Sequence, residues 1–246
     1  MSTRLHAIVV DALDPEAQAR FWAEALRWQP ARSAGTVVTG TRAAVVRPDR
    51  PGGLELRFAA ASGPKAAKNR LHLDLAPGPD QARQVDRLLA LGAEHCDIGQ
   101  GEVPWVVLAD PEGNEFCVLA EVHGAEQERT EGLAAVCLDA DDPAVQSRFW
   151  ADATGWPVVQ RAAWGVRLRA ADGGPSLVMG PPATGKQDTN RLRPLLAPGP
   201  GGTVRAEAER MRAAGAVQLD GMLVDPVVAD SMLADPEGNE FHITEP

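Results

Sequence analysis

The sequence is poor in the features that mark nucleic-acid-binding proteins. Only three of its 24 basic residues are lysines, at positions 65, 68 and 186, and no cluster of lysines and arginines occurs. The formal net charge is −10 and the isoelectric point is near 5.0. Such a chain has no general electrostatic attraction for nucleic acids or anionic lipids. We therefore expect neither a nucleic acid nor a membrane as its partner.

Cysteine is also scarce, and long hydrophobic runs are absent. The three cysteines, at 96, 117 and 137, are an odd number, lie far apart and form no CxxC pair. This pattern favours a reduced, cytoplasmic protein over a disulfide framework. No apolar run approaches the roughly 18 residues of a membrane-spanning helix, and the first residues lack the apolar core of a signal peptide. Phosphate-loop, G-x-S-x-G and G-x-G-x-x-G motifs are absent as well.

The chain does contain enough material for sizeable hydrophobic cores. Its 246 residues are 44% hydrophobic and 24% charged, which is typical of globular rather than disordered proteins. A chain of this length forms one large domain or two domains of ordinary size. It needs neither disulfides nor a structural metal to bury an adequate core.

The sequence is a tandem repeat. The nonapeptide LADPEGNEF occurs at 108–116 and again at 233–241. Residues 5–28 match residues 133–156 at 13 of 24 positions, with D-P and R-F-W-A in the same places. A duplicated unit of about 120 residues accounts for both matches.

A third pair of segments supports the same division. NRLHLDLAPGP at 69–79 is similar to NRLRPLLAPGP at 190–200. We therefore divide the chain into a first repeat at 1–122, a polar linker at 123–130 and a second repeat at 131–246.

Each repeat contains the element order βαβββ twice. The apolar run at 5–11 predicts a strand, and Asp14, followed by a proline, marks the start of a helix with apolar residues at helical spacing. Three β-rich pieces follow at 36–39, 43–47 and 54–59. The same order then returns as a strand, a helix and three strands, at 70–75, 80–91, 94–98, 105–109 and 115–121. The chain therefore holds four βαβββ modules, and we predict an α+β fold.

This pattern resembles the vicinal oxygen chelate superfamily, in which two βαβββ modules curl their sheets into one cup. The motifs that carry the resemblance are D-P…R-F-W-A…W, K-N-R-L-H-L-D-L and L-A-D-P-E-G-N-E-F, and they cover nearly the whole chain. They look most like the glyoxalase-like branch, whose relatives include the bleomycin-resistance proteins. The resemblance implies two tandem domains, each a curved mixed sheet of two modules with its helices outside.

Strand alternation indicates which side chains of the first repeat enter the cup. In the strand that contains the HLDL sequence the leucines share the packed face, so Arg70, His72 and Asp74 point to the concave face. By the same rule the neighbouring strands contribute Glu55, Arg57, Glu115 and Cys117. Such polar residues in a concavity are typical of a ligand pocket, although an open sheet that faces bulk solvent is the alternative.

One aromatic residue completes the predicted binding surface. Trp105 has no aromatic counterpart in the second repeat, so we consider it a candidate wall of the cup, with core packing as the alternative. The tryptophans in and just after the first helix of each repeat are expected to be core residues instead. The predicted ligand-binding residues are thus Arg57, Arg70, His72, Asp74, Trp105, Glu115 and Cys117.

The metal enzymes of the superfamily bind a divalent ion through up to four ligands, one each from the first, fourth, fifth and eighth strands of a cup. The resemblance assigns these positions of the first repeat to Ala7, Glu55, His72 and Cys117. His6 lies one position before the first of them and faces the helix side unless the strand start bends. The second repeat has Ala135, Ser176, Arg193 and His242, and a cationic arginine opposes metal binding.

These sets are incomplete, so we expect no resident metal cofactor. If Zn, Ni, Fe or Mn does bind, the candidate ligands are Glu55, His72 and Cys117, and a thiolate favours zinc. The candidate catalytic residues are then His72 and Glu55. A thiolate–imidazole pair of Cys117 and His72 is a further alternative, but a free cysteine is more often a small buried hydrophobe.

Three functions are compatible with the sequence. The first is a metal-independent protein that binds a small organic molecule in the cup of the first repeat. The second is a metal-dependent lyase, isomerase or dioxygenase that acts on a substrate with neighbouring oxygens. The third is a fused scaffold whose second repeat only mimics a dimer partner. The protein is then a monomeric pseudo-dimer or a homodimer.

The first repeat is expected to be the better ligand site. The inner strand of the second repeat carries Arg193 and Leu195 where the first has His72 and Asp74. Pro194 also predicts an edge or distorted strand there. We therefore expect replacement of His72 to affect binding more than replacement of His242.

Overall fold

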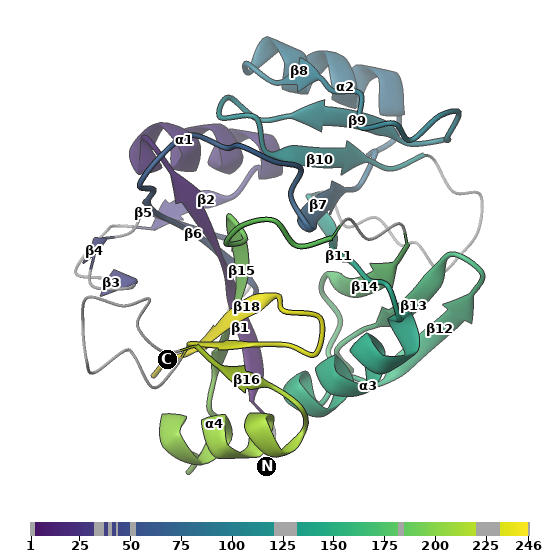
Figure 1. The fold of residues 1–246 in the computed structure, drawn as a ribbon. Helices are drawn as coiled ribbons and strands as arrows, with labels where there is room; N and C mark the ends of the chain where they lie inside the picture. Colours follow the sequence, from purple (N-terminus) through teal and green to yellow (C-terminus); the bar gives the residue numbers. More distant parts are fainter. Residues whose placement is uncertain are drawn as a thin grey trace.

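The computed structural model describes residues 3–31, 37–38, 41–42, 44–49, 53–120, 132–181, 185–219 and 232–245. These residues form two eight-stranded mixed sheets, a two-stranded hairpin and four helices (Figure 1). The predicted α+β class is therefore confirmed. The predicted linker at 123–130 lies outside the described residues. In the described part of the chain, no helix has the length and apolar character of a membrane-spanning segment.

Four βαβββ modules follow one another, as the sequence predicts. The first contains β1 (Arg4–Ala12), α1 (Pro15–Leu26), β2 (Gln29–Ala31), β5 (Ala44–Arg47) and β6 (Glu55–Ala60). The second contains β7 (Leu71–Leu75), α2 (Gln81–Ala90), β8 (Glu94–His95), β9 (Val106–Ala109) and β10 (Glu115–Val118). The third contains β11 (Leu133–Asp139), α3 (Pro143–Thr154), β12 (Val158–Ala162), β13 (Gly165–Leu168) and β14 (Ser176–Gly180). The fourth contains β15 (Leu192–Ala197), α4 (Val204–Ala213), β16 (Val217–Gln218), β17 (Met232–Ala234) and β18 (Glu240–Ile243).

The first module differs from its predicted strand positions. Its first strand after the helix is β2, whereas the prediction placed that strand at 36–39. Within that segment β3 (Val37–Val38) pairs with β4 (Thr41–Arg42) in the separate hairpin. Because β2 is the edge strand of its sheet, it tolerates Pro30, which has no N–H to donate.

Each large sheet joins one module from each repeat. Sheet 1, with the order β16-β17-β18-β15-β1-β6-β5-β2, combines the first and fourth modules. Sheet 2, with the order β12-β13-β14-β11-β7-β10-β9-β8, combines the second and third. The joints are the antiparallel pairs β1–β15 and β11–β7. A sequence repeat is therefore not the same unit as a sheet, because each sheet is built from strands of both repeats.

The sequence predicted an edge or distorted strand at Pro194. The pairing of modules from different repeats places this proline in a central strand instead. Its strand β15 lies in the middle of sheet 1, between β18 and β1. Pro194 lies opposite Ile8 and precedes Leu195 and Leu196, the residues that pair with β18. The sheet therefore accommodates a proline where the pairing with β18 has not yet begun.

The two long helices of the first and third modules start in the same way. Asp14 accepts a hydrogen bond from Ala17 N at 2.9 Å, and Asp142 accepts one from Val145 N at 2.9 Å. A proline follows each aspartate, where the missing N–H costs nothing. The repeated D-P motif is therefore a helix start, as the sequence predicts.

The tryptophans of these helices belong to the core, as predicted. Trp22 and Trp150 are almost fully buried, and each packs edge-on against a phenylalanine of the repeated nonapeptide, Phe116 at 5.2 Å and Phe241 at 5.4 Å between ring centroids. One continuous cluster of buried apolar side chains includes residues of all four modules. Helix and nonapeptide therefore form one packing unit in each repeat.

The nonapeptide turn also binds the helix through a buried carboxylate. Asp110 Oδ1 accepts the backbone N–H groups of Glu112 and Asn114, both at 2.9 Å. Its Oδ2 accepts Trp22 Nε1–H at 3.1 Å. Asp235 makes the matching three contacts in the second repeat. Burial raises the pKa of Asp110, and the hydrogen bonds oppose this rise.

Replacement of either aspartate should destabilise the fold. In Asp110→Ala and in Asp235→Ala, buried N–H donors lose their acceptor, so each variant should lower the free energy of unfolding by at least about 2 kcal/mol. Urea titration checks this, with the exposed Asp86→Ala on α2 as the control. Equal stability of Asp110→Ala and Asp86→Ala would contradict the role given to the turn.

Candidate functional site

The alternation predicted for β7 is confirmed. Its leucines are buried in the main core, whereas His72 and Asp74 are partly exposed on the other face. Arg70, just before the strand, is buried and reaches the second repeat, where its Nη2 lies 3.1 Å from Glu237 Oε2. The polar residues of this segment therefore point away from the packed core.

A bulge turns His6 toward Glu55 on the neighbouring strand. The pairing of β1 with β15 shifts register between Leu5 and Ala7. His6 Nε2 lies 3.8 Å from Glu55 Oε2 and accepts a hydrogen bond from the Arg57 guanidinium. Burial and the Arg57 charge lower the pKa of His6 to about 4. The bend that the sequence required for this orientation is present.

The three metal ligands predicted for the first repeat do not share a sheet. Glu55 lies on β6 in sheet 1, where Arg57 Nη2 is 3.0 Å from its Oε2. His72 and Cys117 lie in sheet 2. The prediction treated the first repeat as one cup, whereas its two modules enter different sheets.

A cysteine of the second repeat lies beside His72 instead. Cys137 on β11 pairs with His72 in the sheet register, and its Sγ donates to Asp74 Oδ2 at 3.0 Å. Donor atoms of His72, Asp74 and Cys137 all lie within 4.8 Å of one another. Burial raises the pKa of both Cys117 and Cys137, which does not favour the thiolate–imidazole pair that the sequence allowed. Sequence reasoning missed Cys137 because it compared ligands only within a repeat.

Two further predicted residues, Glu115 and Trp105, differ in their surroundings. Glu115 is buried. Its carboxylate accepts hydrogen bonds from Lys65 Nζ at 2.6 Å and from the backbone N–H of Asn69 at 3.3 Å. It therefore ties the segment before β7 to β10. Trp105 is 39% exposed, so it is not the core residue that the alternative assignment required.

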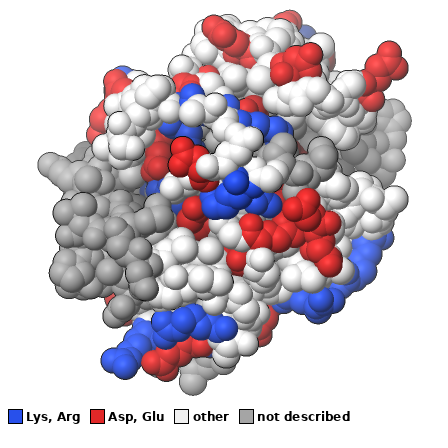
Figure 2. All heavy atoms as spheres, in the orientation of Figure 1, with Lys and Arg blue, Asp and Glu red and all other residues white. Residues whose placement is uncertain are grey.

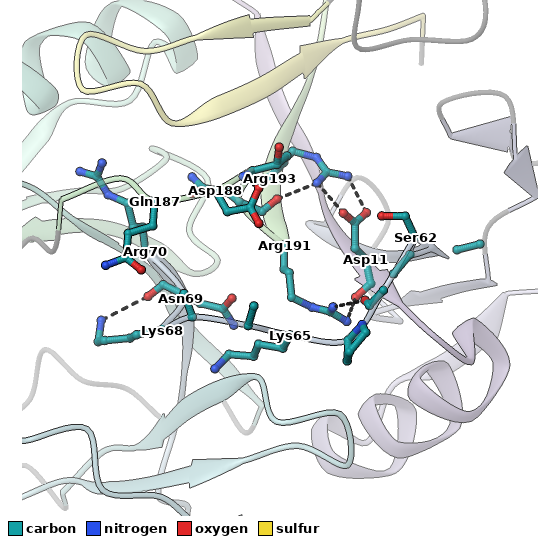
Figure 3. Close-up of a pocket in the computed structure, with 18 of the residues that line it drawn as sticks. Asp11, Ser62, Lys65, Lys68, Asn69, Arg70, Gln187, Asp188, Arg191 and Arg193 are labelled. Atoms are coloured by element: carbon teal, nitrogen blue, oxygen red, sulfur yellow. Dashed lines mark hydrogen bonds and ion pairs between the residues drawn. The ribbon is translucent and has the colours of Figure 1, made fainter.

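A cavity of about 670 Å³ lies between the segment that joins β6 to β7 and the segment that leads to β15. Figure 3 shows side chains from both segments around it, with Asp11 of β1 at one side. Figure 2 shows basic and acidic side chains close together in the hollowed centre of the molecule. The polar lining residues are Asp11, Ser62, Lys65, Lys68, Asn69, Arg70, Gln187, Asp188, Thr189, Asn190, Arg191, Arg193 and His242.

Of the predicted ligand-binding residues, Arg70 alone is among those that line this cavity in the described part of the chain. The cavity borders sheet 1, through Arg193 of β15 and His242 of β18, and not the concave face around His72. A sequence signal was nevertheless present. The chain has only three lysines, and two of them, Lys65 and Lys68, line the cavity.

The cations of the cavity are held in place by carboxylates. Arg193 forms two contacts with Asp11, at 2.7 Å and 2.6 Å (Figure 3). Arg191 Nη2 lies 3.0 Å from Glu112 Oε2. Lys68 pairs with Asp139. These groups are charged and fixed, so a ligand meets them in a defined geometry.

His242 lies at the sheet side of the cavity with both ring nitrogens buried. Neither nitrogen has a hydrogen-bond partner among the described residues. Burial and the Arg193 charge lower its pKa to about 3, so the ring is neutral at pH 7. A neutral imidazole offers one donor and one acceptor for hydrogen bonds.

Comparison with known proteins agrees with this fold. The glyoxalase-like domain family matches residues 7–119 and 135–244. The chain belongs to this family. The protein is similar to glyoxalase I from Zea mays, with a TM-score of 0.68 and 15% identity over 99% of this chain and 92% of that chain. A putative dioxygenase from Bacillus subtilis gives a TM-score of 0.63 and 15% identity over 98% and 85% of the two chains. At these identities the likeness concerns the fold, and no curated protein matches the chain.

The metal positions of the superfamily do not suit a metal in either sheet of this glyoxalase-like protein. With the observed topology, the four ligand positions of sheet 1 are occupied by Ala7, Glu55, Arg193 and His242. Those of sheet 2 are occupied by Ala135, Ser176, His72 and Cys117. In sheet 1 the arginine is already paired with Asp11, and its charge repels a cation. In sheet 2 alanine lacks a donor atom and serine is a poor ligand for a transition metal.

The buried His242 should make the protein acid-sensitive. Its pKa is about 3 in the folded protein and near 6.5 in the unfolded chain, so its contribution to stability is present above pH 6.5 and is lost as the pH falls toward 3. His242→Cys, which introduces the residue of the matching position 117, should reduce the loss of unfolding free energy between pH 7 and pH 5 by about 1–2 kcal/mol. Urea titration at the two pH values measures it. An unchanged pH dependence would refute the assignment.

Proposed function

We propose that this glyoxalase-like protein binds a small polar organic molecule with an acidic group in the cavity beside sheet 1. The observation that carries the proposal is the lining, where five cationic side chains (Lys65, Lys68, Arg70, Arg191 and Arg193) accompany only two carboxylates, Asp11 and Asp188, among the described residues. The volume of about 670 Å³ is within the range of roughly 300–1,000 Å³ that small-molecule sites occupy.

The arrangement of the cations supports an acidic ligand. Several of them are held from behind by carboxylates that do not line the cavity, such as Glu112 and Glu115. Fixing a long cationic side chain before binding removes part of the entropy cost of recognition. Guanidinium groups also match the planar geometry of a carboxylate, which two parallel hydrogen bonds can engage.

This binding does not require the metal of the superfamily. The fifth-strand ligand position of sheet 1 is Arg193, and the Asp11–Arg193 pair lies in the wall of the cavity. Metal-dependent lyase, isomerase or dioxygenase chemistry through the superfamily's ligand positions is therefore the less favoured alternative. In the scaffold alternative the cavity has no ligand of its own.

The site can be tested with the Asp11–Arg193 pair. A panel of small aliphatic and aromatic carboxylic acids and phosphate esters is screened by thermal shift, and the strongest binder is measured by calorimetry. Asp11→Asn/Arg193→Gln should weaken that binder at least about tenfold, since the variant removes a charged donor without leaving an unpaired charge. Treatment with a chelator should leave the affinity unchanged.

Arg205→Ala is the matched control, because Arg205 is an exposed arginine on α4 with a surface partner, Glu209. It should bind like the unaltered protein. Unweakened binding by the Asp11/Arg193 variant, with a normal urea midpoint, would place the ligand elsewhere. If no compound of the panel binds, the scaffold alternative is favoured.

A further inference from the structure

Sheet 2 brings together donor groups from both repeats at a place that the cavity does not include. β7 lies between β10 and β11 (Figure 1). Each of these neighbouring strands carries one cysteine, Cys117 on β10 and Cys137 on β11. In the register, Cys137 is the partner of His72 and Cys117 is the partner of Asp74. Two thiols, one imidazole and one carboxylate therefore lie on three adjacent strands.

Three of these groups have the spacing of a metal site. Cys137 Sγ is 3.0 Å from Asp74 Oδ2, and His72 Nε2 is 3.5 Å from Asp74 Oδ1. The three donor groups lie within 4.8 Å of one another. A tetrahedral zinc ion with bonds of about 2.0–2.3 Å holds its ligand atoms at distances from one another that are similar to these.

One oxygen of this group is buried and unsatisfied. Asp74 Oδ1 has no hydrogen-bond partner among the described residues. Burying a carboxylate oxygen without a partner costs free energy, and a bound cation is one way to recover it. The neighbour of this oxygen is His72 Nε2, which lies at ion-pair distance and makes no hydrogen bond of acceptable geometry to it. A metal ion bound between them would bond to both residues.

Sheet 1 shows that the fold does not need these donors. The positions that match the three donors by sequence repeat and strand pairing hold Arg193, Leu195 and Val9. Leu195 and Val9 belong to a small apolar cluster with Ala7 and Ala59. Apolar packing thus fills two of the three places in the sister sheet, so the fold does not require the carboxylate and the thiol that sheet 2 holds there.

We propose that His72, Asp74 and Cys137 bind one divalent transition-metal ion of borderline softness, with zinc as the favoured ion. The mixed nitrogen, oxygen and sulfur donors suit Zn²⁺ or Co²⁺ better than Mg²⁺ or Ca²⁺. On binding, Cys137 loses its thiol proton to solvent, and its sulfur exchanges the hydrogen bond to Asp74 for a bond to the ion. His72 binds as the neutral imidazole, so a proton carried by its ligating nitrogen is released to solvent as well. Only His72 occupies a ligand position of the superfamily, so this would be a different site assembled across the two repeats.

The test uses the full chain without a histidine tag, in a Cys96→Ser background that removes the more accessible thiol. The protein is reduced, treated with a chelator, dialysed and titrated with Co²⁺ alone. One equivalent of Co²⁺ should bind and produce a thiolate-to-cobalt charge-transfer absorption, which an equivalent of Zn²⁺ should abolish by displacement.

Cys137→Val and Asp74→Leu introduce the residues of the sister sheet, so their folding can be checked by the urea midpoint. Cys137→Val should abolish the absorption, and Asp74→Leu should weaken Co²⁺ binding at least tenfold. Cys137→Ala is the second variant if valine disturbs the fold. Absence of stoichiometric binding, or an absorption that survives in both folded Cys137 variants, would overturn the proposal.

Discussion

The contact on which both sheets depend is made by the glutamate in the middle of the repeated turn. Glu112 accepts the backbone N–H groups of Leu13 and Asp14 at the start of α1, and its carboxylate also pairs with Arg191. Glu237 makes the same contacts in the second repeat, with Arg70 as its cationic partner. One carboxylate thereby joins a strand–helix corner, a turn of the other sheet and the segment that borders the cavity. Charge-assisted bonds of this partly buried carboxylate are sensitive to geometry, so they fix how the two halves meet.

The exact duplication of the turn sequence is consistent with these contacts. Its aspartate, glutamate and phenylalanine each have a partner outside the turn, so a change in either copy removes hydrogen bonds or an ion pair, or leaves a hole in the core. The glutamate after the asparagine has the same duty in both repeats, because Lys65 holds Glu115 and Lys186 holds Glu240. The positions that hold the chain together have therefore stayed the same in both copies.

The side chains on the concave faces differ between the two sheets, because they do not hold the turns, the helix starts and the core together. His72 and Arg193 occupy matching places, yet one lies among thiols and a carboxylate while the other forms an ion pair with Asp11. Cys117 and His242 differ in the same way. Duplication thus supplies two similar scaffolds in which side chains on one face can change chemistry at little cost to the core. This separation of framework and lining is consistent with one fold that hosts many functions.

The repeat, the four modules, the helix starts at the D-P motifs and the faces of β7 could all be predicted from the sequence, because periodicity and local capping depend on neighbours along the chain. It also indicated the family. Which modules share a sheet is visible only in the folded chain. For that reason the sequence did not reveal that Glu55 and His72 lie in different sheets, whereas Cys137 lies beside His72. The partner of a strand edge is chosen by packing over long sequence separations, which no local pattern records. The bulge at His6 and the cavity between the two connecting segments arise in the same way, from pairing across the repeats.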